Sequence, residues 1–163
     1  MKYSIAILLL VISNISFGQL KLEDLQIDTT ITGFHLAADF QGTIVYTKNG
    51  PSDIQTRNPT AFAFTIMENL SAKKAKKQLY KLLSMSEKAG YTISDKIEKD
   101  TTLNGNVCYY LSYKETNLQY NYQNFVFNAF VIKDKTAVIF TSGDLDNRRY
   151  YDKFKKTFYS IKI

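Results

Sequence analysis

Several residue types on which proteins build active sites or cross-links are scarce in this 163-residue sequence. It has no tryptophan, one cysteine, one histidine, two prolines and seven glycines. The single cysteine, Cys108, excludes an intramolecular disulfide framework. The single histidine, His35, excludes a metal site that needs two imidazoles from one chain. Few prolines and glycines argue against long disordered linkers. Because a disulfide framework is excluded, the stability of the fold must come from packing.

Recognisable catalytic motifs are also missing from the sequence. It contains neither a G-x-S-x-G elbow of a serine hydrolase nor a glycine-rich phosphate loop. Asp144 and Asp146 have the D-x-D spacing of calcium ligands, but the rest of a calcium loop is lacking and a helix cap explains them. We therefore predict no catalytic residues, no metal ligands and no cofactor.

Cys108 and His35 are the two candidates for a reactive side chain. Strand alternation places Cys108 on the face of Tyr110 and Ser112, where a buried thiol is the simpler interpretation than a nucleophile. A reactive thiol would need a base, and His35 is the only histidine available. We interpret His35 as a surface or partly buried residue of a first strand.

The start of the chain has the pattern of a secretory signal peptide. An apolar run from Ile5 to Ile12 is followed by small residues at positions 16 and 18, which suit cleavage before Gln19. The run is too short for a permanent membrane anchor, and no cysteine follows it to carry a lipid. The sequence predicts a signal peptide over residues 1–18, one domain over residues 19–163, a periplasmic or secreted location, and no transmembrane segment after signal removal.

One amphipathic helix is predicted in the middle of the chain, at residues 71–90. Ser71 can cap its first turn and Gly90 can end it. At 100° per residue, its apolar residues gather on one face and its lysines on the other. The apolar face contains Ala72, Ala75, Leu79, Leu82, Leu83 and Ala89; the lysine face contains Lys73, Lys74, Lys76, Lys77, Lys81 and Lys88.

Apolar patterning over residues 120–140 (YNYQNFVFNAFVIKDKTAVIF) decides the fold class. Two strands joined by a KDKT hairpin are apolar on both faces, so both faces must be covered, most simply by helices. A last helix follows, which Asp144 or Asp146 can cap and which buries Tyr151, Phe154, Phe158 and Ile161. We predict an α+β fold with an antiparallel sheet of about six strands and helices on both faces, an α/β/α sandwich.

The stretch NFVFNAFVIKDKTAVIFTSG followed by YYDKFKKTFYSIKI resembles the end of a PsbP-like domain. The PsbP-like superfamily includes accessory proteins of photosystem II, the Ran-binding Mog protein of nuclei and DcrB-type proteins of the bacterial envelope. The resemblance extends from Ile31 to Ile163. It implies a PsbP-like fold and a non-enzymatic role in binding other proteins, and it fixes no binding residue. A photosynthetic role is not expected, because the segment through Asp28 is shorter than the docking tails of photosynthetic members.

Two surfaces are candidates for partner binding. Lys73, Lys74, Lys77 and Lys81 suit an acidic protein or another anionic surface, although a face that only keeps the protein soluble is the alternative. Tyr120 and Tyr122, within NLQYNYQN, suit a sugar ring or a protein interface, and an ordinary core edge is the alternative. Nucleic acid is not expected, because the compartment is wrong and no recognised module is present.

These observations lead to a functional prediction. We predict an exported, non-catalytic accessory or protein-binding domain of the bacterial envelope, with another envelope protein or an anionic surface as partner. Without Lys2, 20 basic residues face 15 acidic ones, a formal charge of +5 that weakly favours such partners. The alternatives are an immunity protein that neutralises a toxin, and a small secreted hydrolase that uses Cys108 or a carboxylate pair.

Overall fold

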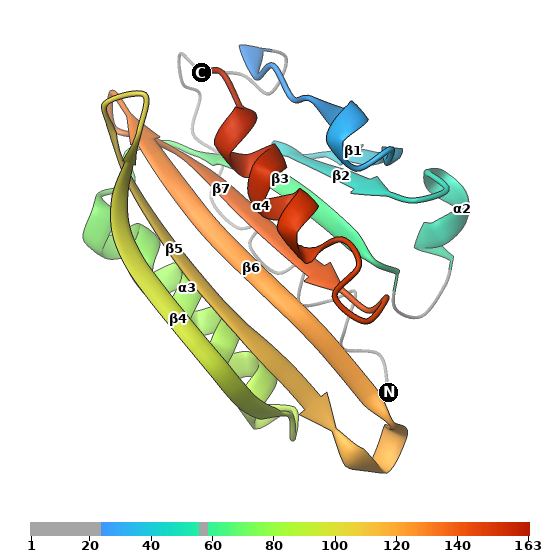
Figure 1. The fold of residues 1–163 in the computed structure, drawn as a ribbon. Helices are drawn as coiled ribbons and strands as arrows, with labels where there is room; N and C mark the ends of the chain where they lie inside the picture. The colour runs from blue at the N-terminus through green and yellow to red at the C-terminus, as the bar shows by residue number, and fades with distance from the viewer. Residues whose placement is uncertain (1–23, 56–58) are drawn as a thin grey trace.

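The computed structural model describes residues 24–55 and 59–163, so the predicted signal peptide lies outside the described residues. Within them, one open sheet has seven strands in the order β1-β2-β3-β7-β6-β5-β4, and every neighbouring pair is antiparallel (Figure 1). The predicted α+β class is confirmed. The predicted count of about six strands was one too low, because the largely exposed first strand and the short second strand both join the sheet.

The elements have the following bounds. The strands are β1 (His35–Phe40), β2 (Thr43–Thr47), β3 (Ala61–Met67), β4 (Thr92–Leu103), β5 (Asn106–Asn117), β6 (Tyr122–Lys133) and β7 (Thr136–Asp144). The α-helices in the described part of the chain are α2 (Pro51–Ile54), α3 (Ala72–Lys88) and α4 (Tyr151–Ser160), and the short 3-10 turns are η2 (Thr29–Ile31) and η3 (Leu118–Tyr120). None of the described helices is long and apolar enough to cross a membrane.

Two-residue turns close the long hairpins of the sheet. Asn104 and Gly105 join β4 to β5, and Asp134 and Lys135 join β6 to β7; all four residues have positive φ. Turns of this kind match the right-handed twist of the flanking strands, which is why Asn-Gly is so common in them. The hairpin between β6 and β7 lies at the KDKT turn that the sequence predicts.

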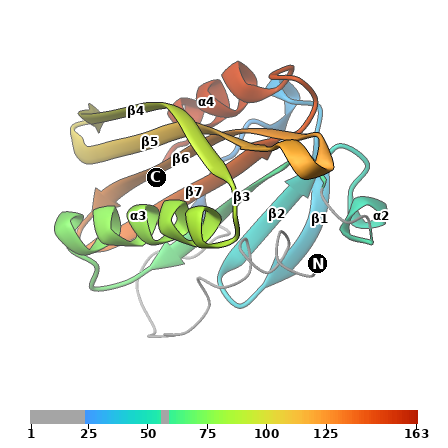
Figure 2. The same cartoon turned by 90° about the horizontal axis from the view of Figure 1, so that it is seen from below.

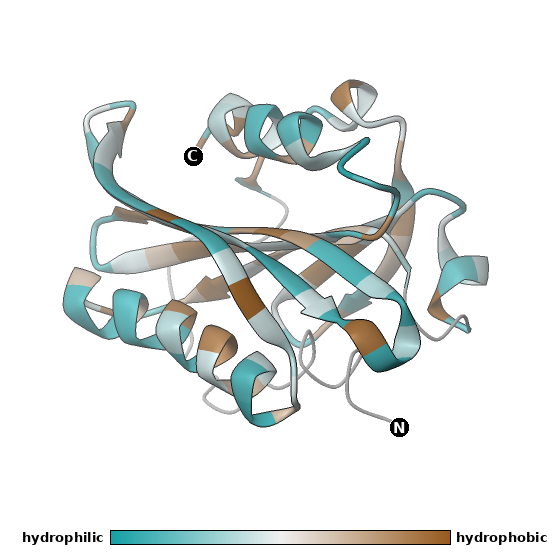
Figure 3. Ribbon diagram, turned by 60° about the horizontal axis from the view of Figure 1, so that its bottom comes forward, coloured by the Kyte–Doolittle hydropathy of each residue, from teal (hydrophilic) through white to brown (hydrophobic). Residues whose placement is uncertain are grey.

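The two helices α3 and α4 lie on opposite faces of the sheet (Figure 3). Along β6, Phe127 and Val131 join a core cluster with Phe154 and Phe158 of α4, while Phe130 joins a second cluster under α3. This alternation explains why β6 is apolar on both faces. Coverage is incomplete, however, because α3 packs mainly on β4, β5 and β6. The fold is therefore an open sheet with one main helix on each face, so helices lie on both faces as predicted, although the α/β/α sandwich arrangement is only partly confirmed.

Helix α3 begins and ends where the sequence predicts. The Ser71 hydroxyl accepts a hydrogen bond from the Lys74 N–H at 3.4 Å, and Gly90, with φ +86°, follows the last turn. Four of the predicted apolar residues are buried, namely Ala75, Leu79, Leu82 and Leu83, whereas Ala89 is exposed. Figure 2 shows β1 and β2 lying beyond the C-terminal end of α3, so that α3 does not extend over this part of the sheet.

Helix α4 is capped from a distance by Asp144, the last residue of β7. Its Oδ2 atom accepts the N–H groups of Tyr150 at 2.5 Å and of Tyr151 at 2.8 Å. Phe154 and Phe158 are fully buried beneath the helix, and Ile161 is 1% exposed. Three of the four predicted contact residues are therefore in the core, and Tyr151 packs against its edge.

Candidate functional site

A cavity of about 190 Å³ opens on the α3 side of the sheet, beside the last turns of the helix. We call it the α3 cavity. It forms where β1, β2 and β3 extend past the end of α3, so that none of the described helices covers the strand side chains there. Its apolar walls include Ala38, Val45, Ala61, Leu82 and Val126, and its polar residues include Ser86, Tyr91, Tyr113, Glu115, Tyr122 and Asn128.

Glu115 of β5 is the only formally charged residue among the described residues that line the α3 cavity. It is 7% exposed, and its two carboxyl oxygens accept hydrogen bonds from the Ser86 hydroxyl and from Asn124 Nδ2, the latter at 2.8 Å. No lysine, arginine or histidine in the described part of the chain pairs with it. Burial raises the pKa of Glu115 above its ordinary value, and the hydrogen bonds from Ser86 and Asn124 oppose that shift only in part.

Three tyrosines surround this carboxyl. Tyr113 is 4% exposed and lies two residues before Glu115 on the same face of β5. The rings of Tyr91 and Tyr122 pack against each other with centroids 5.1 Å apart. Burial first, and then the charge of Glu115, raise the pKa values of Tyr113 and Tyr122, so both phenols stay protonated at any physiological pH.

The floor of the α3 cavity contains an irregularity between β6 and β7. The backbone pairing stops after Val126 and Gly143 and resumes at Ala129 and Phe140. In the gap, Oδ1 of the buried Asn128 accepts the N–H of Ser142 at 3.3 Å. A side-chain amide thus replaces a ladder hydrogen bond, which holds the polar group of Asn128 at the bottom of the cavity.

The predicted partner-binding residues fall into separate places. Tyr122 lines the α3 cavity, whereas Tyr120 lies in η3 and is 54% exposed. The four predicted lysines remain on the outer side of α3, where all are exposed; they are Lys73, Lys74, Lys77 and Lys81. Asn121, the left-handed C-cap of η3, separates the two tyrosines along the chain.

Lys76 does not belong to the exposed lysine face. Its ammonium lies 2.5 Å from Asp100 on β4 and 4.5 Å from the ring centroid of Tyr109. The Tyr109 hydroxyl in turn donates to Glu98 at 2.5 Å. Lys76 therefore ties α3 to the edge strand of the sheet and is a structural contact, unlike its neighbours on the helix.

Cys108 and His35 are far apart and on different surfaces. Cys108 is fully buried in the core cluster on the α4 side, and burial raises the pKa of its thiol to about 12. His35 is exposed on the edge strand β1. Four strands lie between β1 and β5, which corresponds to about 24 Å of sheet at the usual strand spacing. The structure thus does not bring together the thiol and the base that a cysteine hydrolase would need.

Glu115, Tyr113, Ser86 and Asn128 were missed at the sequence level. A signal for Glu115 was present: Tyr109, Leu111, Tyr113 and Glu115 alternate along one face of β5, so the carboxyl follows three buried residues. A buried carboxyl at the end of an apolar row is unusual. By contrast, nothing local in the sequence indicates that Ser86 of α3 reaches Glu115, because that contact depends on how the helix is placed on the sheet.

Comparison with known proteins places the chain by its fold. No family model matches the sequence, and a search of curated proteins finds no similar one. Among solved structures, cyanobacterial PsbP (CyanoP) from Synechocystis sp. PCC 6803 is similar with a TM-score of 0.55 at 14% identity, over 91% of this chain and 97% of that one. The protein PA94 of Pseudomonas aeruginosa is similar with a TM-score of 0.49 at 14% identity, over 76% of this chain and 84% of that one. The predicted PsbP-like resemblance is confirmed at the level of the fold.

Proposed function

We propose that the chain is an exported, non-catalytic binding protein whose binding site is the α3 cavity. The observation that carries this proposal is the composition of the cavity: its apolar walls enclose the buried carboxyl of Glu115, the buried phenol of Tyr113 and the half-buried phenol of Tyr122. Ligand sites typically combine apolar walls with a few polar groups that fix orientation. The α+β fold shared with cyanobacterial PsbP is compatible with such a role.

The chemistry of the α3 cavity favours binding over hydrolysis. A hydrolase needs at least two convergent groups whose pKa values suit proton transfer or nucleophilic attack. Here one carboxyl is accompanied by tyrosines whose pKa values are raised by burial, so neither phenol acts as a base near neutral pH. Cys108 is on the opposite face of the sheet and offers no alternative nucleophile to this cavity.

A fragment screen by NMR tests this proposal. The mature protein, with its methyl groups labelled, would be titrated with small aromatic fragments of three kinds: cationic, neutral and anionic. We expect the shifts to gather on Val45, Leu82 and Val126, whose methyl groups line the cavity. A Val126→Phe variant, which fills the cavity, should lose the response. The proposal is overturned if fragments of all three kinds leave the chemical shifts of these methyl groups unchanged.

The lysine face of α3 is a second candidate contact surface, for an acidic envelope protein. Lys73 and Lys74 lie in the first turn of α3, which contains no acidic residue. Positive charge there is disfavoured by the helix dipole, and an acidic partner would relieve this. The residues proposed for contact are Lys73, Lys74, Lys77 and Lys81.

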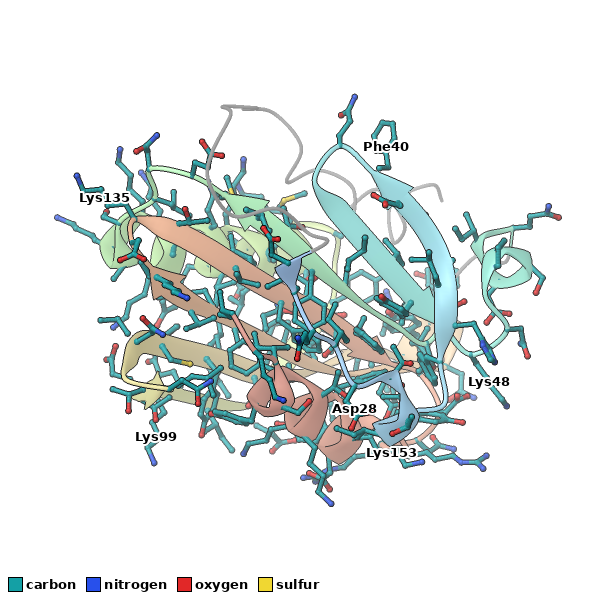
Figure 4. All side chains as sticks on the ribbon, turned by 90° about the horizontal axis from the view of Figure 1, so that it is seen from above. Asp28, Phe40, Lys48, Lys99, Lys135 and Lys153 are labelled. Carbon is teal, nitrogen blue, oxygen red and sulfur yellow. The ribbon has the colours of Figure 1, made fainter. Side chains whose placement is uncertain are left out.

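Capture from an envelope extract at low and high salt tests the lysine face. We expect an acidic partner to be retained at low salt and released at high salt, since salt screens exposed charges. Changing Lys73, Lys74 and Lys77 to glutamate should abolish capture. A control with the same charge change would use Lys48, Lys99 and Lys135, which are exposed on other parts of the molecule (Figure 4). Equal loss in both variants would show that only net charge matters.

A further inference from the structure

Among the residues that the structure describes, none places a positive charge beside Glu115 in the α3 cavity. Its carboxyl is held by two neutral donors, Ser86 and Asn124. Removing an ionised carboxylate from water without a compensating positive charge is costly, so the empty site disfavours the charged form. A cation that enters the cavity would supply the missing charge. The same step would make the carboxylate form of Glu115 the stable one.

Two other features of the α3 cavity also favour positive charge. The rings of Tyr91, Tyr113 and Tyr122 line it, and the faces of aromatic rings attract cations. Ser86 and Tyr91 bring the C-terminal turn of α3 to the cavity, and the backbone carbonyls of that turn carry the negative end of the helix dipole. The carboxyl of Glu115, the aromatic rings and the C-terminal end of the helix therefore all favour a positively charged ligand.

The size and walls of the cavity limit the ligand further. Its volume of about 190 Å³ is somewhat larger than the roughly 150 Å³ of an engineered apolar cavity that binds benzene. The walls contributed by Val45, Leu82 and Val126 are apolar and suit a hydrocarbon body. A bare metal ion would not fill this volume, and among the described residues no group of three or more histidine, cysteine or acidic side chains is placed to hold one.

We propose that the α3 cavity binds a small organic cation: an ammonium group on an apolar body about as large as benzylamine. The ammonium lies against Glu115 and the tyrosine rings, and the body packs on Val45, Leu82 and Val126. This inference rests on the proposed function and specifies its ligand class. The cation can be a free amine or the amine-bearing end of a larger molecule; the chemistry recognised is the same.

Binding is coupled to the protonation of Glu115. The titratable groups that face this carboxyl are Tyr113 and Tyr122, whose pKa values are raised by burial, so both stay protonated below pH 9. The ring of Tyr91 packs against that of Tyr122. Burial raises the pKa of Glu115 in the empty cavity, so an ammonium that binds beside it displaces a proton to solvent from those molecules in which Glu115 is protonated. Affinity for the cation should therefore rise between pH 5 and pH 7.5, with up to one proton released per ligand at the lower pH.

Three probes of similar size but different charge test the proposal on the mature protein: benzylamine, benzyl alcohol and benzoate. Calorimetry at pH 5 and pH 7.5, in buffers of different ionisation enthalpy, would measure affinity and proton release. At pH 7.5 we expect benzylamine to bind at least tenfold more tightly than benzyl alcohol, and benzoate not to bind. Benzyl alcohol or benzoate binding as tightly as benzylamine would overturn the inference, yet leave the α3 cavity as a binding site. No binding by any of the three would also overturn it.

Two variants separate a direct role of the carboxyl from a general effect on folding. Glu115→Gln keeps the shape and removes the charge, so benzylamine affinity should fall at least tenfold while benzyl alcohol affinity is kept. Tyr122→Leu removes one ring and should weaken benzylamine more than benzyl alcohol. If Glu115→Gln does not fold, the proposal is tested by the affinities of Tyr122→Leu and by the proton release of the native protein. Unchanged benzylamine affinity in folded Glu115→Gln contradicts the proposal.

Discussion

The side chain of Asn124 lies directly over the backbone of Gly143. A Cβ atom on Gly143 would be 2.9 Å from Oδ1 of Asn124 and 3.2 Å from its Nδ2. That Oδ1 atom is buried and has no hydrogen-bond partner in the described part of the chain, while Nδ2 donates to Glu115. The glycine on β7 is thus the reason why an asparagine on β6 can orient a buried carboxyl on β5.

Replacing Gly143 by alanine should disturb the α3 cavity through Asn124. The added methyl group would push the amide aside and break its hydrogen bond to Glu115. We expect the free energy of unfolding to fall by about 1–3 kcal/mol, the usual range for forcing one extra carbon into a packed site. Urea denaturation at pH 7 measures this change.

A double-mutant cycle shows whether the effect passes through Asn124. In an Asn124→Ala background there is no amide to displace, so the Gly143→Ala substitution should cost far less. A coupling free energy of at least about 0.5 kcal/mol is expected between contacting residues. If the two substitutions are additive, the alanine acts on the backbone of β7 and not on Asn124.

Glu115 should make stability depend on pH in the direction opposite to most carboxyls. Its pKa is raised in the folded state, so the folded protein holds this proton more tightly than the unfolded chain. The stabilisation is complete below the unfolded pKa of about 4.3 and is lost as pH rises through the folded pKa. Relative to Glu115→Gln, the native protein should therefore become less stable between pH 4 and pH 8, as measured by urea denaturation.

Glu98 provides the control for this pH dependence. Hydrogen bonds from Tyr109 and then Tyr80 lower its pKa, so its contribution is present above the unfolded pKa and is lost as pH falls. On acidification, the difference in unfolding free energy between the native protein and Glu98→Gln should thus shrink. Over the same pH range, the native protein should become more stable relative to Glu115→Gln. Equal pH slopes for both variants would contradict the burial of Glu115.

Asp144 should be among the most sensitive polar residues of the fold. It is fully buried, and its carboxylate accepts three backbone N–H groups, those of Asp146, Tyr150 and Tyr151. Asp144→Ala leaves these donors unpaired at the start of α4, and we expect a loss of about 2–4 kcal/mol in thermal or chemical unfolding. Asp146→Ala, at an exposed position, should change stability by less than about 0.5 kcal/mol.

Much of the fold could be predicted because its signals are local. Asn104-Gly105 marks a hairpin, Ser71 and Gly90 delimit α3, and the two-faced apolar pattern of β6 requires cover on both sides. The sequence could not show which of Asp144 and Asp146 caps α4, because that depends on the path of the loop between them and the helix. How much of the sheet α3 covers could not be predicted either, since it depends on where α3 lies across the strands.

The candidate site was only partly predictable, because its members meet through tertiary contacts. Tyr122 was expected in a binding surface, and it does line the α3 cavity. Glu115 and Ser86 are 29 positions apart in the sequence, and their hydrogen bond exists only because α3 packs across β5. The lysines of α3 could be recognised from the sequence because their charges recur on one face of the helix, whereas nothing in the composition distinguishes Glu115 from the other acidic residues, 15 in all.

Cys108 should resist alkylation until the protein unfolds. The thiol is fully buried between β5 and α4, and with a pKa of about 12 only about one molecule in 10⁴ is a thiolate at pH 8. We expect iodoacetamide to modify the folded protein at least 100-fold more slowly than the same protein in urea, as followed by mass spectrometry. Fast modification of the folded protein would show that the α4 side opens readily, and it would revive the hydrolase alternative that Cys108 represents.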